Sequence, residues 1–221
     1  MNQRSKEPTN TQTHDASQPG ELVVLALHGH GESAASARQW AYGILPPTTT
    51  IHTLQADVSA QGVRSWFETG PYGVVPQDLA ATIQRVQNKL TELHDLGHHV
   101  ILAGFSQGGA VVLGAMYLHV QCIAAMAFCS FFPEVDWDHV RSEFEVHSDA
   151  TDDPLSTPTL IVGRTEDPDV PSFFSEDAHA FLESSGYNSN LRILSGGHEV
   201  SEVVRSTARE WLRDVSVGVD A

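Results

Sequence analysis

Residues 100–112 read VILAGFSQGGAVV, and the order of residue types in this stretch decides the fold. A continuous apolar run ends at Phe105, and a single serine, Ser106, follows between Gly104 and Gly108. A second apolar run begins directly after the last glycine. Because glycine lets a backbone bend sharply and pack closely, we expect a strand, a tight turn and a helix that together expose the Ser106 hydroxyl.

Short continuous apolar runs recur along the chain and predict the strands of one sheet. They read ELVVLAL, TIHTLQ, HHVILAGF, CIAAMAFC, TLIVG and LRIL, in that order. Such runs are typical of strands that are covered on both faces. Helical spacing of apolar residues lies between them, over 78–93, 172–185 and 201–214. This alternation predicts an α/β fold with a mostly parallel central sheet and helices on both faces.

The composition indicates one folded domain preceded by a polar tail. The chain has 221 residues, of which 41% are hydrophobic, so it can fill a sizeable core. Residues 1–20 contain almost no apolar side chain, and we expect a disordered tail there and a single domain over residues 21–221. The segment 133–158 is acidic and irregular, which predicts a short helix or a mobile flap.

The charge and the apolar content exclude several classes of partner. A formal net charge of −16 repels phosphate backbones, so nucleic-acid binding is not expected. No stretch approaches the roughly 20 apolar residues of a membrane span, so stable membrane insertion is not expected either. The N-terminus lacks the apolar centre of a secretory signal, and Cys122 and Cys129 both lie in an apolar run. These features predict a cytoplasmic protein with reduced thiols.

The stretch around Ser106 fits the G-x-S-x-G elbow of α/β-hydrolases, although the bare pattern also occurs by chance. A serine hydroxyl is a weak nucleophile, so it needs a histidine base and an acid that orients the base. The histidines that follow it are His119, His139, His147, His179 and His198. His198 alone lies between the last strand and the last helix, at the carboxyl end of a strand, where open α/β sheets bind ligands and place catalytic residues. We therefore predict that His198 is the general base.

The orienting acid is expected in the loop that follows the strand TLIVG. This loop reads GRTEDPDVP and offers Glu166, Asp167 and Asp169. All three follow the same strand, and turn carboxylates are often merely solvated, so position alone leaves the choice among them open.

Backbone N–H groups must stabilise the negative oxygen that forms when a serine attacks a carbonyl. One donor is expected at Gln107, directly after the nucleophile, and the other in the early loop LALHGHGES. The same loop places His28 and His30 at a spacing that could hold a metal ion, but no cluster of Cys or carboxylates accompanies them. It also lacks the Gly-Lys-Ser/Thr ending of a phosphate-binding loop. We therefore expect neither a metal site nor a phosphate-binding loop here.

Five motifs in fixed order resemble the phospholipase/carboxylesterase family, which includes acyl-protein thioesterases and small bacterial carboxylesterases. The motifs are LHGHG, SWFE at residues 65–68, GFSQGGAV, DPDVP and GGHEVS. The resemblance extends from Leu22 to Leu212. It implies an α/β-hydrolase fold without a large cap, no cofactor, and ester or thioester substrates that carry an acyl chain.

The resemblance also implies roles for individual residues. Ser106 would be the nucleophile, Asp167 the orienting acid and His198 the base, while the backbone N–H groups of His30 and Gln107 would form the oxyanion hole. The chain departs from the family pattern beside this site at Glu68, at Cys129-Ser130 and at Gly163-Arg164. Aromatic side chains that either line an acyl groove or belong to the core are Trp66, Phe67, Phe131 and Phe132.

The resulting prediction is a serine carboxylesterase or thioesterase that forms an acyl-enzyme on Ser106. Its partner would be a small acyl ester or thioester, including one on an acylated protein. A lysophospholipase or a dienelactone-type hydrolase would use the same machinery, although the latter usually has cysteine as its nucleophile. A catalytically silent protein that binds an apolar ligand is the alternative from another class. Acyl-chain length, natural substrate and oligomeric state do not follow from the sequence.

Overall fold

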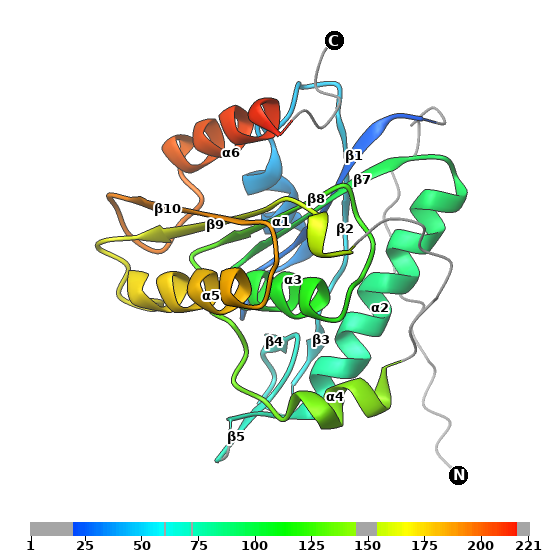
Figure 1. The fold of residues 1–221 in the computed structure, drawn as a ribbon, viewed down its shortest axis with the longest axis vertical. Coiled ribbons are helices and arrows are strands. Elements are labelled where there is room, and N and C mark those ends of the chain that lie inside the picture. Colours follow the sequence, from blue (N-terminus) through cyan, green and yellow to red (C-terminus); the bar gives the residue numbers. More distant parts are fainter. Residues whose placement is uncertain (1–19, 60, 72, 145–153, 216–221) are drawn as a thin grey trace.

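The computed structural model describes residues 20–59, 61–71, 73–144 and 154–215, and its centre is a six-stranded parallel sheet (Figure 1). The strands, in chain order, are β1 (Leu22–Leu27), β2 (Thr50–Thr53), β7 (His99–Phe105), β8 (Ala124–Phe128), β9 (Thr159–Arg164) and β10 (Ser189–Leu194). Their spatial order is β10-β9-β8-β7-β1-β2, and every pairing is parallel. All six predicted strands are therefore confirmed. Of the predicted tail, residues 1–19 lie outside the described residues.

Helices cover both faces of the sheet, as predicted. They are α1 (Ala34–Ala41), α2 (Pro76–Asp95), α3 (Gln107–Tyr117), α4 (Trp137–Glu143), α5 (Ser172–Ser184) and α6 (Glu202–Asp214), with a 3₁₀ turn η1 (Pro154–Ser156). Buried side chains of α1 and α6 pack on one face, whereas those of α2, α3 and α5 pack on the other. In Figure 1, α3 and α5 lie below the strands β8, β9 and β10, and α6 lies above them on the opposite side of the sheet.

Strand β1 shows why the apolar runs are continuous. Val23, Leu25 and Leu27 join the core cluster built with α2 and α3. Val24 and Ala26 point to the opposite face and pack with α1 and α6. Successive side chains of a strand alternate between faces, so a strand covered on both sides must be apolar at every position.

Two local features differ from the sequence prediction. Helix α2 begins at Pro76, two residues before the predicted helical spacing over 78–93, because proline is tolerated in the first turn, where a backbone N–H has no intrahelical partner. The carboxylate of Asp78, in this first turn, accepts the backbone N–H of Glu68. Two small hairpins between β2 and α2 were not predicted; they consist of β3 (Asp57–Val58), β4 (Arg64–Ser65), β5 (Thr69–Gly70) and β6 (Gly73–Val74).

The described part of segment 133–158 contains the short helix α4, which is one of the two structures that the sequence allowed. Residues 145–153, on which the flap interpretation depends, lie outside the described residues.

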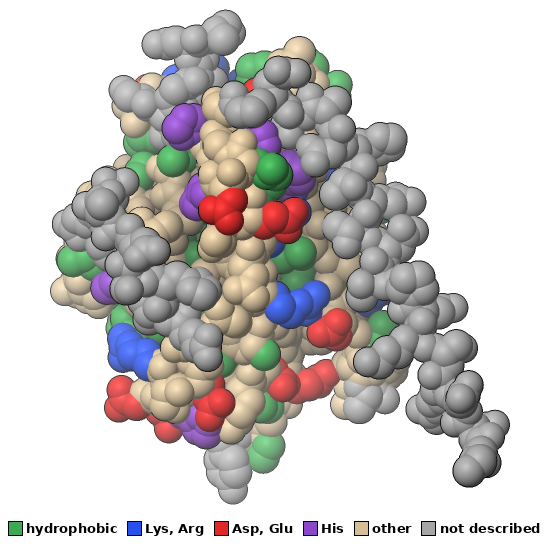
Figure 2. Space-filling view, turned by 90° about the vertical axis from the view of Figure 1, so that its right-hand side faces the viewer, with side chains coloured by type: hydrophobic (Ala, Val, Ile, Leu, Met, Phe, Trp, Pro, Cys, Tyr) green, Lys and Arg blue, Asp and Glu red, His purple; other side chains and the backbone are tan. Residues whose placement is uncertain are grey.

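Within the described ranges, no helix is long and apolar enough to cross a membrane. The face turned to the viewer in Figure 2 carries interspersed acidic, basic and histidine side chains, and the described residues form no broad basic patch on it.

Candidate active site

Ser106 lies at a sharp turn between the end of β7 and the start of α3. Its backbone has φ 53° and ψ −121°, and a positive φ is strained for a residue with a side chain. The flanking glycines make the turn possible. A Cβ on Gly104 would overlap the backbone of Gly108, and a Cβ on Gly108 would lie 2.5 Å from the carbonyl oxygen of His28. The fold thus needs both glycines to hold Ser106 in this position.

Two hydrogen bonds connect Ser106, His198 and Asp167, which are far apart in the sequence. His198 Nε2 lies 3.0 Å from Ser106 Oγ, and His198 Nδ1 lies 2.7 Å from Asp167 Oδ2. The Asp167 side chain is fully buried and that of His198 is 16% exposed. An ionised carboxylate only accepts hydrogen bonds, so Nδ1 carries the imidazole proton and Nε2 is free to accept the Ser106 hydroxyl proton.

The loop after β9 places one of the three candidate acids against His198. Asp167 Oδ1 accepts the backbone N–H groups of Asp169 (2.9 Å) and Val170 (2.8 Å), which leaves Oδ2 to face the imidazole. Glu166 and Asp169 are exposed, and no hydrogen bond joins either of them to His198 among the described residues. Asp167 is therefore the carboxylate in position to orient the ring.

The three other candidate histidines that lie within the described residues make hydrogen bonds elsewhere in the fold. His119 contacts the Tyr187 hydroxyl, and His179 contacts the Ser189 hydroxyl. His139, which is half-buried, contacts the Gln77 side chain. His147 lies outside the described residues.

A buried arginine supports the loop that carries His198. Arg164, at the end of β9, is 3% exposed and donates from one terminal nitrogen to Ser201 Oγ (2.7 Å). Its guanidinium fills the space in which a Cβ of Gly196 would lie. The Phe105 ring also packs against the His198 ring, with centroids 4.7 Å apart. The loop is held from two sides, which limits the movement of the imidazole.

The early glycine loop lies directly beside Ser106. A Cβ on Gly29 would lie 3.3 Å from the Cβ of Ser106. The backbone N–H groups of His30 and Gln107 have no hydrogen-bond acceptor within the described part of the chain. Unpaired N–H groups beside a nucleophile can bind a developing negative oxygen, so these two groups are candidate donors of an oxyanion hole.

His28 holds this loop as a neutral imidazole. Its Nε2 accepts the backbone N–H of Ala56 (3.1 Å), so its Nδ1 carries the proton and donates it to the carbonyl oxygen of Gly29 (2.7 Å). Burial lowers the pKa of His28 below its ordinary value of 6.5. Both ring nitrogens thus contact protein atoms.

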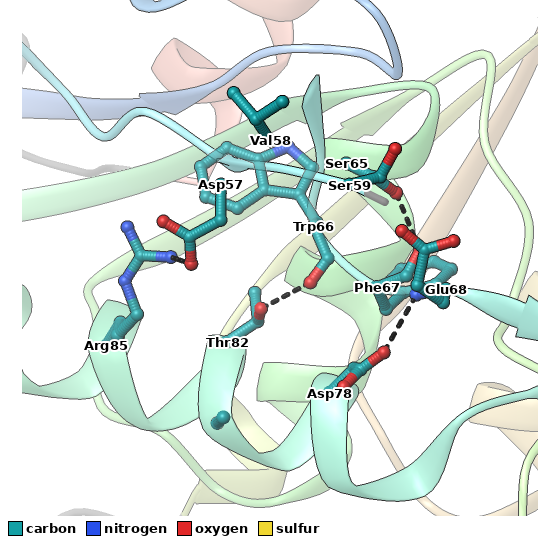
Figure 3. Close-up of a pocket in the computed structure, with 11 residues that line it drawn as sticks. Asp57, Val58, Ser59, Ser65, Trp66, Phe67, Glu68, Asp78, Thr82 and Arg85 are labelled. Carbon is teal, nitrogen blue, oxygen red and sulfur yellow. Dashed lines mark hydrogen bonds and ion pairs between the residues drawn. The ribbon is translucent and has the colours of Figure 1, made fainter. Parts of the chain in front are cut away.

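The side chain of Gln107 fixes the segment SWFE, a role that the sequence did not indicate. Its Oε1 accepts the backbone N–H of Trp66 (2.9 Å), and its Nε2 donates to the carbonyl oxygen of Phe67 (2.9 Å). Thr82 of α2 donates to the carbonyl oxygen of Trp66 on the side drawn in Figure 3. Gln107 and its two partners are 41 and 40 positions apart in the sequence, so no local sequence pattern predicts these hydrogen bonds.

A cavity of about 230 Å³, lined by both polar and apolar side chains, lies beside this segment (Figure 3). Asp57 and Arg85 form an ion pair at its rim, with 2.9 Å between Oδ2 and Nη1. Neither Ser106 nor His198 lines the cavity, so it is separate from the serine site.

The four aromatic candidates for an acyl groove divide into two groups. Trp66 and Phe67 are 3% and 4% exposed and belong to the core, where they offer little surface to a substrate. Phe131 and Phe132 are partly buried. Phe173 and Phe174, which were not predicted, are 52% and 41% exposed. Two adjacent aromatics, separated from DPDVP only by Ser172, were a usable signal.

Hydrogen bonds link the Ser106 turn to the segment that precedes Phe131 and to helix α5. Ser130 donates to the carbonyl oxygen of Ser106 (2.9 Å), and Ser175 donates to the carbonyl oxygen of Ser130 (3.0 Å). The ring of Phe131 contacts that of Phe174, with centroids 6.5 Å apart. Phe131 therefore directly follows a residue that contacts the Ser106 turn, and its ring meets Phe174 of α5.

Comparisons with known proteins agree with this architecture. The profile of the family described as Phospholipase/Carboxylesterase matches residues 9–216, nearly the whole chain. A probable carboxylesterase, SOBER1-like, of Arabidopsis thaliana is 23% identical over 214 residues, which is 86% of this chain and 77% of that protein.

Three solved structures have the same fold at low sequence identity. Arabidopsis thaliana SOBER1 superposes with a TM-score of 0.72 and 20% identity, covering 89% of this chain and 99% of its own. Acyl-protein thioesterase 2 of Zea mays has a TM-score of 0.69 and 19% identity, with coverage of 92% and 96%. A Bacillus cereus carboxylesterase has a TM-score of 0.68 and 19% identity, with coverage of 91% and 90%. The fold is that of the α/β-hydrolases.

Proposed function

Because the chain belongs to the phospholipase/carboxylesterase family, we propose that it is a serine hydrolase that cleaves carboxylic esters or acyl thioesters through an acyl-enzyme on Ser106. The observation that carries this proposal is the pair of hydrogen bonds from Asp167 through His198 to the Ser106 hydroxyl. A serine without such a base is a weak nucleophile at neutral pH.

Each group has a role in the proposed reaction. As Ser106 Oγ attacks the acyl carbonyl carbon, its proton passes to His198 Nε2. The imidazolium that forms is stabilised by the Asp167 carboxylate. His198 then gives this proton to the leaving oxygen or sulfur, which departs as an alcohol or a thiol. Water, deprotonated by the same nitrogen, attacks the acyl-enzyme and releases the carboxylic acid.

The oxyanion hole is proposed at the backbone N–H groups of His30 and Gln107. Gln107 is the first residue of α3, so the positive end of the helix dipole also stabilises a negative oxygen beside its N–H. The hydrogen bonds of the Gln107 side chain to the segment SWFE limit the movement of this residue. A donor held in place before the reaction starts stabilises the transition state without reorganisation.

The acyl chain is proposed to lie on the surface formed by Phe131, Phe174 and Phe173. Partly exposed aromatic rings lose water contact when an alkyl chain covers them, which contributes about 0.8 kcal/mol per buried CH₂ group. Because the surface is open to solvent at Phe173, we expect chains of several lengths to be accepted. Phe132 packs into a separate cluster with Trp137 and Phe181, so it is not part of the proposed acyl surface.

Hydrolysis of p-nitrophenyl esters and of matched acyl thioesters, each in a series of rising chain length, tests the proposal. The wild type should turn over both, and the Ser106→Ala variant should turn over neither while keeping its circular-dichroism spectrum. Ser142→Ala is the matched control, because Ser142 is exposed on α4 and donates only to the carbonyl oxygen of His139. Equal activity in Ser106→Ala and Ser142→Ala would refute the assignment. Binding of acyl ligands without turnover in the wild type would favour the ligand-binding alternative.

A further inference from the structure

A thiol lies against the acid–base pair, and the proposed hydrolysis does not use it. Cys129 directly follows β8 with φ 49° and is fully buried. Its Sγ, a carboxylate oxygen of Asp167 and a ring nitrogen of His198 all lie within 4.8 Å of one another. In the part of the chain that the structure describes, no other group of three His, Cys, Asp or Glu side chains meets this condition.

We propose that Cys129, Asp167 and His198 form a latent site for a thiophilic divalent cation such as Zn²⁺, and that the bound cation switches the hydrolase off. One sulfur, one imidazole nitrogen and one carboxylate oxygen are the ligand types that zinc combines in proteins. The inhibitory part of this inference rests on the proposed function, whereas the binding part does not.

The geometry requires small movements of the imidazole and of the sulfur. His198 Nδ1 and Asp167 Oδ2 are 2.7 Å apart, with a proton between them. Two ligands about 2.0–2.1 Å from a tetrahedral zinc ion lie roughly 3.3 Å apart, so the imidazole must retreat by about half an ångström. A zinc-bound sulfur lies roughly 3.6 Å from the other ligand atoms, so Cys129 Sγ, now within 4.8 Å of them, must approach by at most about 1.2 Å. Arg164 and Phe105 hold the loop of His198, so the shift of the imidazole is expected to come from a small rotation of its side chain.

The charges of the ligands match those of a divalent cation. The cation would displace the thiol proton into solvent and pair with one thiolate and one carboxylate. The buried guanidinium of Arg164 also acts on this thiol, but it donates to Ser201 Oγ and lies 4.0 Å from the Glu199 carboxylate, so its own charge has a partner.

Occupation of the site would remove the base. A neutral imidazole has one proton, and a cation on Nδ1 leaves that proton on Nε2. Nε2 would then donate a hydrogen bond to Ser106 Oγ and could no longer accept the serine proton. The same cation would separate Asp167 from the ring that it orients.

Inhibition by Zn²⁺ tests the switch. Ester hydrolysis is followed during a Zn²⁺ titration of the wild type, Cys129→Ser and Cys122→Ser, each relative to its own rate with a chelator present. Cys122 is the matched control, because it is also buried but contacts Met116 instead of the active site. We expect the inhibition midpoint to rise at least tenfold in Cys129→Ser and to stay at the wild-type value in Cys122→Ser. A chelator should restore the original rate in each case.

Binding of Co²⁺ tests the site without any catalysis. A Co²⁺–thiolate bond gives a charge-transfer absorption band that histidine and carboxylate sites on the surface do not give. The band should form in the wild type and in Cys122→Ser, and should be absent in Cys129→Ser. No band in the wild type would overturn the site, and a band without inhibition by Zn²⁺ would overturn the switch. A wild type that hydrolyses no ester would refute the proposed function, while the Co²⁺ band would still decide whether the site exists.

Discussion

Replacing Asp167 by Asn should change the protonation of His198 while leaving the surrounding backbone in place. In the wild type, Asp167 Oδ1 accepts two backbone N–H groups and Oδ2 accepts His198 Nδ1–H. In Asp167→Asn the amide oxygen must take the Oδ1 position, because an NH₂ group there would face two donors. The NH₂ group would therefore face Nδ1, which could only accept, and the imidazole proton would move to Nε2.

The expected cost follows from the loss of the base. With its proton on Nε2, His198 cannot take the proton of Ser106, and catalysis depends on the rare productive tautomer. A wrong tautomer of this kind costs about 10⁴-fold in kcat, or about 5.4 kcal/mol of transition-state stabilisation. KM should change far less than kcat, because the aromatic surface around Phe131 and Phe174 is not altered.

Steady-state hydrolysis of a short p-nitrophenyl ester measures this effect. Asp169→Asn is the matched control, since Asp169 lies two residues away but is exposed, and it should keep kcat within about twofold of the wild type. Thermal unfolding of both variants checks that the fold is retained. A folded Asp167→Asn variant with more than a tenth of the wild-type kcat would refute the reasoning, as would a larger loss in Asp169→Asn.

Three further predictions concern the supports of the site. Gly108→Ala should lower the free energy of unfolding in urea by about 3 kcal/mol or more, because its Cβ would lie 2.5 Å from a backbone oxygen. Gly70→Ala, whose Cβ would lie 3.9 Å from the nearest such atom, should cost less than about 1 kcal/mol. Equal costs in the two variants would contradict this prediction. Because the pKa of His28 is lowered in the folded protein, the unfolded chain binds more protons, and the free energy of unfolding should fall as the pH drops below about 6.5. This fall should be smaller in His28→Gln. The same dependence of the unfolding free energy on pH in both proteins would contradict the prediction. Phe174→Ala should lower kcat/KM for long acyl chains more than for acetate esters, and a uniform loss would argue against an acyl surface there.

Much of the fold was predictable because its main signals are local in sequence. Both faces of the sheet are covered, so each strand had to be a continuous apolar run, and Val23 to Leu27 show how the two cores share one strand. The turn at Ser106 was predictable for the same reason, since its strain and close packing require Gly104 and Gly108. The two small hairpins were missed because their strands contain only two residues each.

The less predictable features depend on contacts between distant segments. The choice of Asp167 over Asp169 follows from the direction in which one loop turns its carboxylate, which no periodicity encodes. The hydrogen bonds of the Gln107 side chain to the segment SWFE join residues about 40 positions apart. In the sequence, Cys129 is one more apolar residue at the end of the run CIAAMAFC. Only the folded chain brings its sulfur to Asp167 and His198.

The most direct test of the proposed mechanism is the site of covalent labelling by a fluorophosphonate, an analogue of the acyl transition state. Mass spectrometry of the treated protein and of its peptides measures the number of phosphonyl groups and the residue that carries them. The mechanism predicts one group, on Ser106, and none in His198→Ala or Ser106→Ala under the same brief exposure. A wild type that stays unlabelled from pH 6 to 9, or that carries the group on another residue, would contradict it.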